Sequence, residues 1–558
     1  MKGLLQCSAN YIPLTPLSFL ERAALVYGDK ASIIYGTIRF SWKQTHRRCV
    51  KLASALVQLG ISPLDVVAAF APNVPALYEL HFGVPMAGAI LSALNTRLDA
   101  TTLAAILDQL EAKIVLVDYQ FVDVLVKALD QLSQRKCMLS TKNQKRKCKL
   151  PIIVLIPECD HQTSTPSWIN LEDLPNGSLN YDQLLSMGKA DEFETILPNN
   201  ECDPISVNYT SGTTGYPKGV VYSHRAVYLK SIGTILNIEM RPMPVFLWTV
   251  DMFRCNGWCF PWTIAALGGT NVCLRTFSAK VIFDSIALHG VTHICGKPTI
   301  LNIIAGASDT SEQVPSAPLQ SSVEIIVAGA LPVPQILTRV MELGFIISHG
   351  YGMTEVLGPA IITPCKLPGK QLHSLMLEGV DVKDSKTMES VPYDGKTMGE
   401  IMFKGNTMML GYLKNSSATK EACKGGWYRT GDIGIRHPDG DVQMKDRAKD
   451  IIISNGEVIS SLEVETVLLS NPKVSEAAVV GRNVGDDCLG TSGGSNSRHF
   501  AFVKLKEGCS ASSKEIIKFC GENLPPYMVP HDAIFGDLPV NSTGKVQKFV
   551  LRDKANVL

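Results

Sequence analysis

The sequence predicts an α/β protein with more than one domain, and three observations support this class. Its 558 residues, 46% of them apolar, exceed what a single hydrophobic core organises. Apolar runs of strand length alternate with helix-like stretches through most of the chain. Toward the carboxyl terminus this alternation gives way to short strands and turns, and then to a smaller α+β pattern. The alternation favours mostly parallel sheets that are covered by helices on both faces.

The predicted elements follow from local patterns, taken in chain order. Strands are expected at the apolar runs 31–36, 65–72, 113–119, 151–156, 292–296, 323–329 and 344–352. Helices are expected over 42–59 and 74–89. From Gly399 onward the sequence changes to short strands and turns, and after Arg447 a further helix is expected over 460–472.

Charge and composition limit the kinds of partner. The net charge of +1 and the pI near 7.5 provide no general field for nucleic acid or an anionic membrane. The basic segment 134–151 is expected to be a solvated surface loop rather than a nucleic-acid arm, because it lacks aromatic residues for stacking. The apolar run 82–95 is shorter than the roughly 20 residues of a membrane-spanning helix.

The expected compartment is the cytoplasm. The amino terminus lacks the pattern of a secretory signal, and the carboxyl-terminal "KANVL" lacks a peroxisomal signal of the Ser-Lys-Leu type. The 15 cysteines are scattered without CxxC pairs, which favours free thiols in a reducing compartment.

A Gly-rich turn, "NYTSGTTGYPKGVVYSHR" at 208–225, is the first candidate site. Glycine lets backbone N–H groups approach an anion, several Thr and Ser hydroxyls add donors, and Lys218 adds a full charge. The turn therefore indicates a polyphosphate-binding loop. A Walker loop is disfavoured because no Ser or Thr follows the lysine, and an ordinary Gly-rich surface loop is the alternative.

Four further motifs extend this interpretation: "HGYGMTE" at 349–355, "GWYRTGDIG" at 426–434, "KDRAKDIIISNGE" at 445–457 and "PVNSTGKVQK" at 539–548. With the Gly-rich turn, the sequence resembles the adenylate-forming acyl-activating superfamily of AMP-dependent acyl-CoA synthetases, and looks most similar to plant enzymes for short and medium-chain acids. The resemblance implies an adenylation domain over 1–445 with two stacked α/β sheets and a β-rich subdomain. It also implies a small, mobile α+β domain over 446–558 that carries a catalytic lysine.

The resemblance assigns roles to individual residues. It places the catalytic groups at Lys545, Thr354 and Glu355, the magnesium ligands at Glu355 and Thr210, and the hinge between the domains at Asp446. In the family the Gly-rich turn holds the β- and γ-phosphates, and a carboxylate and an arginine hold the ribose hydroxyls. The residues that match nucleotide-binding positions are Thr210, Ser211, Gly212, Thr213, Thr214, Lys218, Gly329, Ala330, Gly350, Tyr351, Asp432 and Arg447.

The chain departs from the family pattern near the expected acyl pocket. Arg254 stands where the family usually has histidine, Asp251 replaces a proline, and Lys297 replaces a small residue. These changes indicate either drift with altered packing or recognition of a second carboxylate. Trp258 suggests a short pocket, although a tryptophan of the core would give the same pattern, and Asn455 replaces a glycine of a turn.

The expected activity is therefore an ATP-dependent carboxylic acid:CoA ligase that releases AMP and pyrophosphate. ATP, Mg²⁺ and CoA are the implied cofactors and co-substrates, and a short or medium-chain, branched or small aromatic acid is the implied substrate. Two alternatives remain open: an adenylating enzyme with an acceptor other than CoA, and a degenerate, non-catalytic nucleotide-binding homologue. Peroxisomal location is possible from the family, and the oligomeric state is not predicted.

Overall fold

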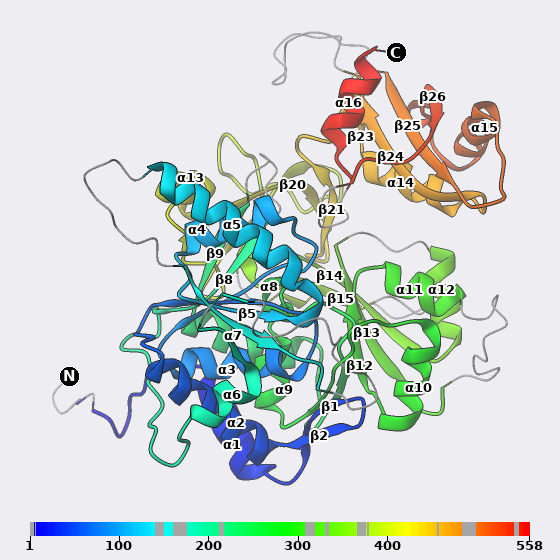
Figure 1. Ribbon diagram of the computed structural model, residues 1–558. Coiled ribbons are helices and arrows are strands. Elements are labelled where there is room, and N and C mark those ends of the chain that lie inside the picture. Colours follow the sequence, from blue (N-terminus) through cyan, green and yellow to red (C-terminus); the bar gives the residue numbers. More distant parts are fainter. Residues whose placement is uncertain are drawn as a thin grey trace.

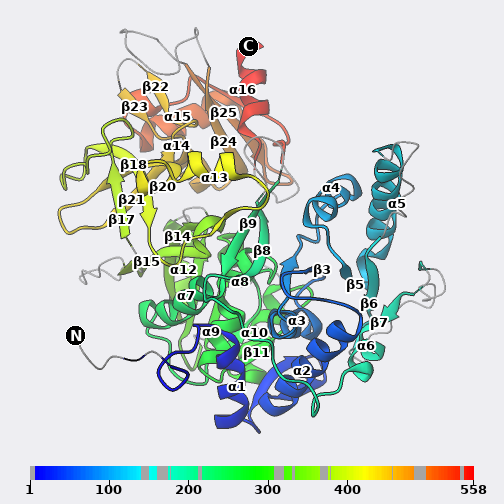
Figure 2. The same cartoon turned by 90° about the vertical axis from the view of Figure 1, so that its left-hand side faces the viewer.

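The computed structural model describes residues 5, 7–139, 150–159, 174–175, 177–210, 217–306, 319–329, 334–364, 375–376, 379–454, 457–482, 498–540 and 546–557. The elements drawn from blue to green form one large body, and the orange and red carboxyl-terminal elements form a smaller body beside it (Figure 1). The same division is visible after a quarter turn (Figure 2).

One large sheet has nine strands in the order β16-β15-β14-β13-β12-β10-β11-β1-β2. They are β1 (Ala31–Tyr35), β2 (Ile38–Ser41), β10 (Val245–Leu247), β11 (Thr270–Val272), β12 (His293–Gly296), β13 (Val323–Ala328), β14 (Phe345–Met353), β15 (Gly358–Pro364) and β16 (Leu375–Met376). The strands from β14 to β1 pair in parallel, and β2, β15 and β16 are antiparallel.

The second large sheet has eight strands in the order β19-β9-β8-β4-β3-β5-β6-β7. They are β3 (Val66–Phe70), β4 (Ile90–Ala93), β5 (Ile114–Asp118), β6 (Ile152–Ile156), β7 (Leu179–Asn180), β8 (Pro204–Thr210), β9 (Lys218–Ser223) and β19 (Gly411–Tyr412). The strands from β8 to β7 are parallel, whereas β9 and β19 extend the sheet antiparallel.

Helices fill the space between these sheets and cover their outer faces. The inner core contains side chains of α1 (Leu17–Val26), α2 (Trp42–Gln58), α3 (Pro75–Met86), α6 (Tyr181–Met187), α7 (His224–Asn237) and α9 (Phe260–Ala266). Helices α4 (Ala100–Leu110) and α5 (Val122–Leu139) pack on the outer face of the eight-stranded sheet. Helices α10 (Ala279–His289), α11 (Thr299–Gly306) and α12 (Pro334–Glu342) cover the outer face of the nine-stranded sheet.

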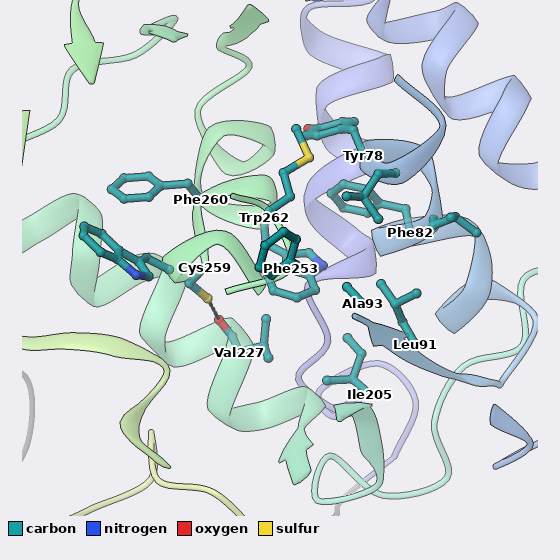
Figure 3. Packing of buried hydrophobic residues seen from close by; sticks show 14 of the residues in the cluster. Tyr78, Phe82, Leu91, Ala93, Ile205, Val227, Phe253, Cys259, Phe260 and Trp262 are labelled. Carbon is teal, nitrogen blue, oxygen red and sulfur yellow. Dashed lines mark hydrogen bonds between the residues drawn. The ribbon is translucent and has the colours of Figure 1, made fainter. Parts of the chain in front are cut away.

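Strand β3 shows why the parallel strands are apolar throughout. Its alternate side chains point to opposite faces, so Val67 and Ala69 enter the inner core while Ala68 and Phe70 enter the outer one. The inner core brings together residues distant in sequence, including Tyr78, Phe253 and Trp262 (Figure 3). Because both faces of the sheet are buried, every position of this strand is occupied by an apolar residue.

Smaller sheets complete the molecule. An antiparallel sheet contains β17 (Gly379–Lys383), β18 (Met398–Lys404), β20 (Tyr428–Arg436) and β21 (Val442–Arg447), and α13 (Ser416–Ala422) lies before β20. The carboxyl-terminal body contains β22 (Ile452–Ser454), β23 (Glu457–Ile459), β24 (Val474–Gly481), β25 (His499–Leu505), β26 (Asp532–Phe535), α14 (Ser461–Ser470), α15 (Ser513–Asn523) and α16 (Lys548–Val557). The α/β class, the two large sheets and the smaller carboxyl-terminal part are thus confirmed.

The individual elements predicted from the sequence are also present, with ends shifted by a few residues at most. Two expectations need correction. The segment 134–151 is not wholly a loop, because α5 continues to Leu139; no Gly or Pro interrupts the helix before that point, and 140–149 lie outside the described residues. The antiparallel sheet begins at β17, upstream of Gly399. None of the described helices is long and apolar enough to cross a membrane.

Candidate active site

The two strands that flank the Gly-rich turn bring Thr210 and Lys218 opposite each other. Strands β8 and β9 pair antiparallel, and these two residues are register partners at the open end of the hairpin. The turn itself lies outside the described residues, and with it Ser211, Gly212, Thr213 and Thr214. The arrangement places one hydroxyl and one ammonium group at the base of the turn, where an anion held by the turn would meet them.

The end of β14 lies against this hairpin. Thr354 and Glu355 form a 3-10 turn directly after β14. The Tyr222 hydroxyl, from β9, donates to the Thr354 carbonyl oxygen at 2.6 Å. The Tyr412 hydroxyl, from β19, donates to Oε1 of Glu355 at 2.8 Å. Both large sheets therefore contribute to one polar surface.

Gly350 lies on β14 opposite Ala328, the last residue of β13. Gly329 follows β13 with φ of +106°, which favours glycine. A Cβ atom on Gly350 would lie 2.9 Å from Cβ of Pro359, so a larger residue would displace β15. Close packing therefore favours glycine at position 350, next to Tyr351, and Ala330 lies outside the described residues.

Tyr351, Asp432 and Arg447 form a second polar cluster. The Tyr351 hydroxyl donates to Oδ2 of Asp432 at 2.9 Å, and Nε of Arg447 lies 3.7 Å from Oδ1 of the same carboxylate. Asp432 and Arg447 are register partners on β20 and β21. Burial, and then the charge of Asp432, raise the pKa of the Tyr351 hydroxyl, so it remains a neutral donor. The carboxylate is thus oriented before any ligand binds.

Glu355 fits a magnesium ion. Its residue is 9% exposed, and it forms no ion pair with any described residue. A buried carboxylate without a protein cation is suited to a bound cation, and Mg²⁺ takes few protein oxygens while keeping water and substrate phosphate oxygens as further ligands. Thr210, the other predicted magnesium ligand, ends β8 opposite Lys218. When bound, the ion would neutralise polyphosphate charge.

The segment 251–259 carries the residues that depart from the family pattern. Nε of Arg254 lies 2.9 Å from Oδ2 of Asp251, and the same oxygen lies 3.5 Å from Nη1 of Arg97. The two unusual residues therefore pair with each other. Nη2 of Arg254 is buried and has no hydrogen-bond partner among the described residues. Lys297 directly follows β12 and is half-buried.

Five consecutive residues, 255–259, have φ between 41° and 70°. This left-handed turn is unusual for residues other than glycine. It brings Sγ of Cys255 to 3.5 Å from Oγ1 of Thr354 and places Trp258 against Gly358, where a Cβ would lie 3.1 Å from the tryptophan Cβ. Trp258 is therefore a buried, closely packed residue, which matches the core alternative.

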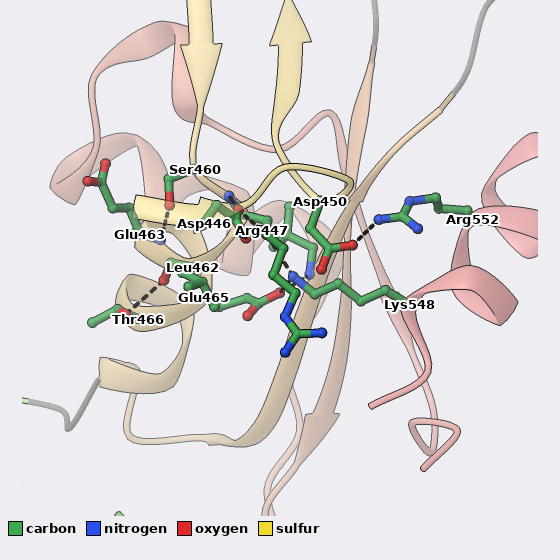
Figure 4. A network of polar contacts seen from close by, with 12 residues as sticks. Asp446, Arg447, Asp450, Ser460, Leu462, Glu463, Glu465, Thr466, Lys548 and Arg552 are labelled. Atoms are coloured by element: carbon green, nitrogen blue, oxygen red, sulfur yellow. Dashed lines mark hydrogen bonds and ion pairs between the residues drawn. The ribbon is translucent and has the colours of Figure 1, made fainter. Parts of the chain in front are cut away.

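The predicted hinge connects the two bodies through a network of polar contacts (Figure 4). Asp446 belongs to β21, but its Oδ2 accepts from N and Oγ of Ser461, at the start of α14, at 2.6 Å each. Nζ of Lys548 lies 2.6 Å from Oγ of Ser461 and 2.6 Å from Oε1 of Glu465. Helix α16 therefore binds close to the predicted hinge, and Lys545 precedes this helix outside the described residues.

Sequence reasoning missed the tyrosines that hold the site. Tyr222 and Tyr412 contact Thr354 and Glu355, yet in the sequence each is a lone aromatic residue in an apolar run. A buried tyrosine of the core has the same local pattern. Only the pairing of β19 with β9 identifies Tyr412 as part of the site.

Two family models match the chain. The one described as AMP-binding enzyme matches residues 20–413, and the one described as AMP-binding enzyme C-terminal domain matches 463–545. The chain belongs to the AMP-binding enzyme family. These matches and the relatives described next confirm two predictions. The chain is an acyl-activating enzyme, and its class is an acid:CoA ligase that forms an acyl-adenylate.

Curated relatives cover the full chain. A peroxisomal butyrate–CoA ligase of Arabidopsis thaliana is 45% identical, over 100% of this chain and 96% of its own. A 2-methylpropanoate–CoA ligase of Humulus lupulus is 42% identical over 100% and 97%. A peroxisomal trans-cinnamate:CoA ligase of Petunia hybrida is 43% identical over 100% and 96%.

Solved structures show the same fold. The anthranilate CoA ligase AuaEII in complex with anthranoyl-AMP aligns with a TM-score of 0.81 at 22% identity, covering 99% of each chain. The o-succinylbenzoate CoA synthetase of Bacillus subtilis in complex with ATP and magnesium aligns with a TM-score of 0.76 at 22% identity, covering 96% of this chain and 99% of its own. At this identity the likeness concerns the fold of this AMP-binding enzyme.

Proposed function

We propose that this protein joins a short or medium-chain, branched or small aromatic carboxylic acid to CoA in two steps, with ATP and Mg²⁺. The observation that carries the proposal is the oriented Asp432 carboxylate on β20, which is held by Tyr351 of β14 and by Arg447 of the adjacent strand β21. Tyr351 also connects this cluster to the first one, because it precedes Thr354 by three residues in the chain. One nucleotide can extend between the two clusters, with its ribose at Asp432.

The chemistry assigned to each cluster follows from charge. A carboxylate is a poor electrophile, and attack of its oxygen on the α-phosphorus of ATP forms an acyl-adenylate and releases pyrophosphate. Lys218 and the Thr210 hydroxyl would hold the outer phosphates, and Thr354 the α-phosphate. Glu355 would hold magnesium, and Lys545 would neutralise the charge that develops between acid and phosphate. A thiol of CoA then takes the acyl group and AMP leaves.

The substrate proposal rests on the relatives and on the acyl side of the site. Four relatives are named as ligases of butyrate, 2-methylpropanoate, trans-cinnamate and acetate. The close packing of Trp258 against Gly358 would favour compact acids if Trp258 borders the acyl chain. The pairing of Arg254 with Asp251 favours altered packing over recognition of a second carboxylate.

Pyrophosphate release tests the function. Purified protein is incubated with ATP, Mg²⁺ and a panel of short, medium-chain, branched, aromatic and dicarboxylic acids, with and without CoA. CoA-dependent release with one class of acid, and an acyl-CoA product by mass spectrometry, are expected. Release without any thioester would favour an acceptor other than CoA. ATP binding without turnover on the whole panel would favour the non-catalytic alternative.

Asp251→Asn is expected to shift selectivity toward a dicarboxylic acid. The change removes the carboxylate that occupies Arg254, so the guanidinium can bind a second carboxylate of the substrate. The ratio of kcat/KM for succinate over butyrate should rise about tenfold, the worth of one hydrogen bond to a charged group. Arg254→Met in the Asp251→Asn background should remove the gain. An unchanged ratio would place Arg254 away from the acyl chain.

The proposed compartment is reducing, with the cytoplasm first and the peroxisome as the alternative. The described cysteines are free, and burial raises the pKa of several thiols, including Cys259 and Cys273, which keeps them protonated and unreactive. Two of the relatives named above are peroxisomal. A fluorescent fusion imaged with peroxisomal and cytoplasmic markers distinguishes the two.

A further inference from the structure

Strand β19 joins the two sides of the polyphosphate site. Gly411 and Tyr412 pair with Val221 and Val220 of β9, the strand that begins with Lys218. Beyond these pairs, the Leu410 amide donates to the Val221 carbonyl oxygen at 2.8 Å, and the Leu413 amide donates to Gly219 at 2.7 Å. The backbone around Tyr412 is thus fixed on both sides.

The same short segment also holds Glu355. The Met409 amide donates to the Glu355 carbonyl oxygen at 2.9 Å, and the Tyr412 hydroxyl donates to its side-chain Oε1 at 2.8 Å. Tyr412 is 8% exposed, so this hydrogen bond is shielded from water. A donor on one carboxylate oxygen fixes the rotation of the carboxylate, as a hydrogen-bonded support does for metal ligands generally.

The ring of Tyr412 faces the lysine. Nζ of Lys218 lies 4.9 Å from the ring centroid, which is within the range of a cation–π contact. Lys218, Tyr412, Pro217 and Gln109 line a cavity of about 330 Å³ on this side of the hairpin. One side chain therefore contacts the candidate magnesium carboxylate through its hydroxyl and the candidate phosphate lysine through its ring.

We propose that Tyr412 is a positioning residue that holds Glu355 and Lys218 in a single arrangement for a magnesium polyphosphate. The inference rests on the proposed function, in which these two residues bind the metal and the outer phosphates. The hydroxyl sets the direction of the Glu355 carboxylate. The ring keeps the Lys218 ammonium at the base of the Gly-rich turn when no phosphate is bound, so less side-chain freedom is lost on binding.

Tyr412→Phe and Tyr412→Leu separate the hydroxyl from the ring. Mn²⁺ replaces Mg²⁺ as a paramagnetic probe, and its binding to protein with a non-hydrolysable ATP analogue is measured by electron paramagnetic resonance. Tyr412→Phe should weaken Mn²⁺ binding about tenfold and leave metal-free binding of the analogue and the KM for the acid unchanged. Tyr412→Leu should weaken metal-free analogue binding as well, by about threefold.

Two controls make the result specific. Tyr78→Phe removes another buried hydroxyl, which donates to the Pro261 carbonyl oxygen in the core, and should leave Mn²⁺ binding unchanged. In a Glu355→Gln background, Tyr412→Phe should have little further effect on Mn²⁺ binding, because the two act through one contact.

Wild-type Mn²⁺ affinity in Tyr412→Phe would overturn the proposal, as would an equal loss in Tyr78→Phe. If Tyr412→Leu fails to fold, the proposal is still tested by Mn²⁺ binding to Tyr412→Phe in the wild-type and Glu355→Gln backgrounds. Absence of pyrophosphate release by the wild-type protein on every acid would count against the proposed function, whereas the Mn²⁺ comparison would still test Tyr412.

Discussion

Lys545→Ala is expected to abolish acyl-adenylate formation while thioester formation from a supplied acyl-adenylate largely survives. During adenylation, negative charge develops between the acid and the α-phosphate, and a lysine placed there stabilises it. Loss of one such group should lower the rate of acid-dependent ATP/pyrophosphate exchange by about 1000-fold. The second step uses an acid that is already activated, so acyl-CoA formed from synthetic acyl-adenylate and CoA is the matched measurement.

Lys554→Ala provides the control. Lys554 is exposed on α16, the helix that follows Lys545, so the variant removes a lysine of the same region without touching the proposed site. Its exchange rate should equal that of the wild type. Undiminished exchange in Lys545→Ala, or an equal loss of both half-reactions, would refute the assignment of this lysine.

The strands and helices could be predicted because their causes are local. The strands of the parallel sheets are short apolar runs between turn residues, as in Ile114–Asp118, which is buried along its whole length. The helix beginning at Trp42 follows a capping box formed by Ser41 and Gln44. Such signals lie within a few residues of each other, so a single sequence contains them.

The parts that could not be predicted depend on contacts between distant segments. Tyr412 and Glu355 are far apart in the chain and meet only because β19 joins the edge of β9. The left-handed turn 255–259 has no local signal, since only one of its five residues is glycine. The environment around it stabilises the turn: Asn208 and Ser206, on β8, contact the Asn256 side chain at 2.7 and 2.8 Å.

The residues that depart from the family pattern also could not be interpreted from the sequence alone. From the sequence, Arg254 and Lys297 were two added cations whose meaning was open. The structure pairs Arg254 with Asp251, the neighbouring departure, so the two changes compensate each other in charge. The sequence alone did not show that these two side chains form an ion pair. The structure shows it, because the backbone turns between Asp251 and Arg254 and brings the side chains together.

Asp432→Ala is expected to lower kcat/KM for ATP about 1000-fold, the worth of two hydrogen bonds from ribose hydroxyls to a charged acceptor. Asp432 is 6% exposed and already oriented by Tyr351 and Arg447, so little of its binding energy is lost to ordering. Pyrophosphate release at saturating acid, with ATP varied, measures the effect. Asp439→Ala, in the exposed turn between β20 and β21, should leave the value unchanged and controls for the same hairpin.

A change of nucleotide separates a ribose contact from a structural role of Asp432. The wild-type protein should use 3′-deoxy-ATP about 10- to 100-fold less efficiently than ATP, because the oriented carboxylate then lacks one donor. The Asp432→Ala variant lacks the carboxylate that would accept a hydrogen bond from the 3′-hydroxyl. It should therefore use ATP and 3′-deoxy-ATP almost equally. If the variant is poor with ATP but still discriminates as the wild type does, Asp432 supports the sheet and another group reads the ribose. Loss of discrimination together with loss of rate would support contact of the carboxylate with the ribose hydroxyls.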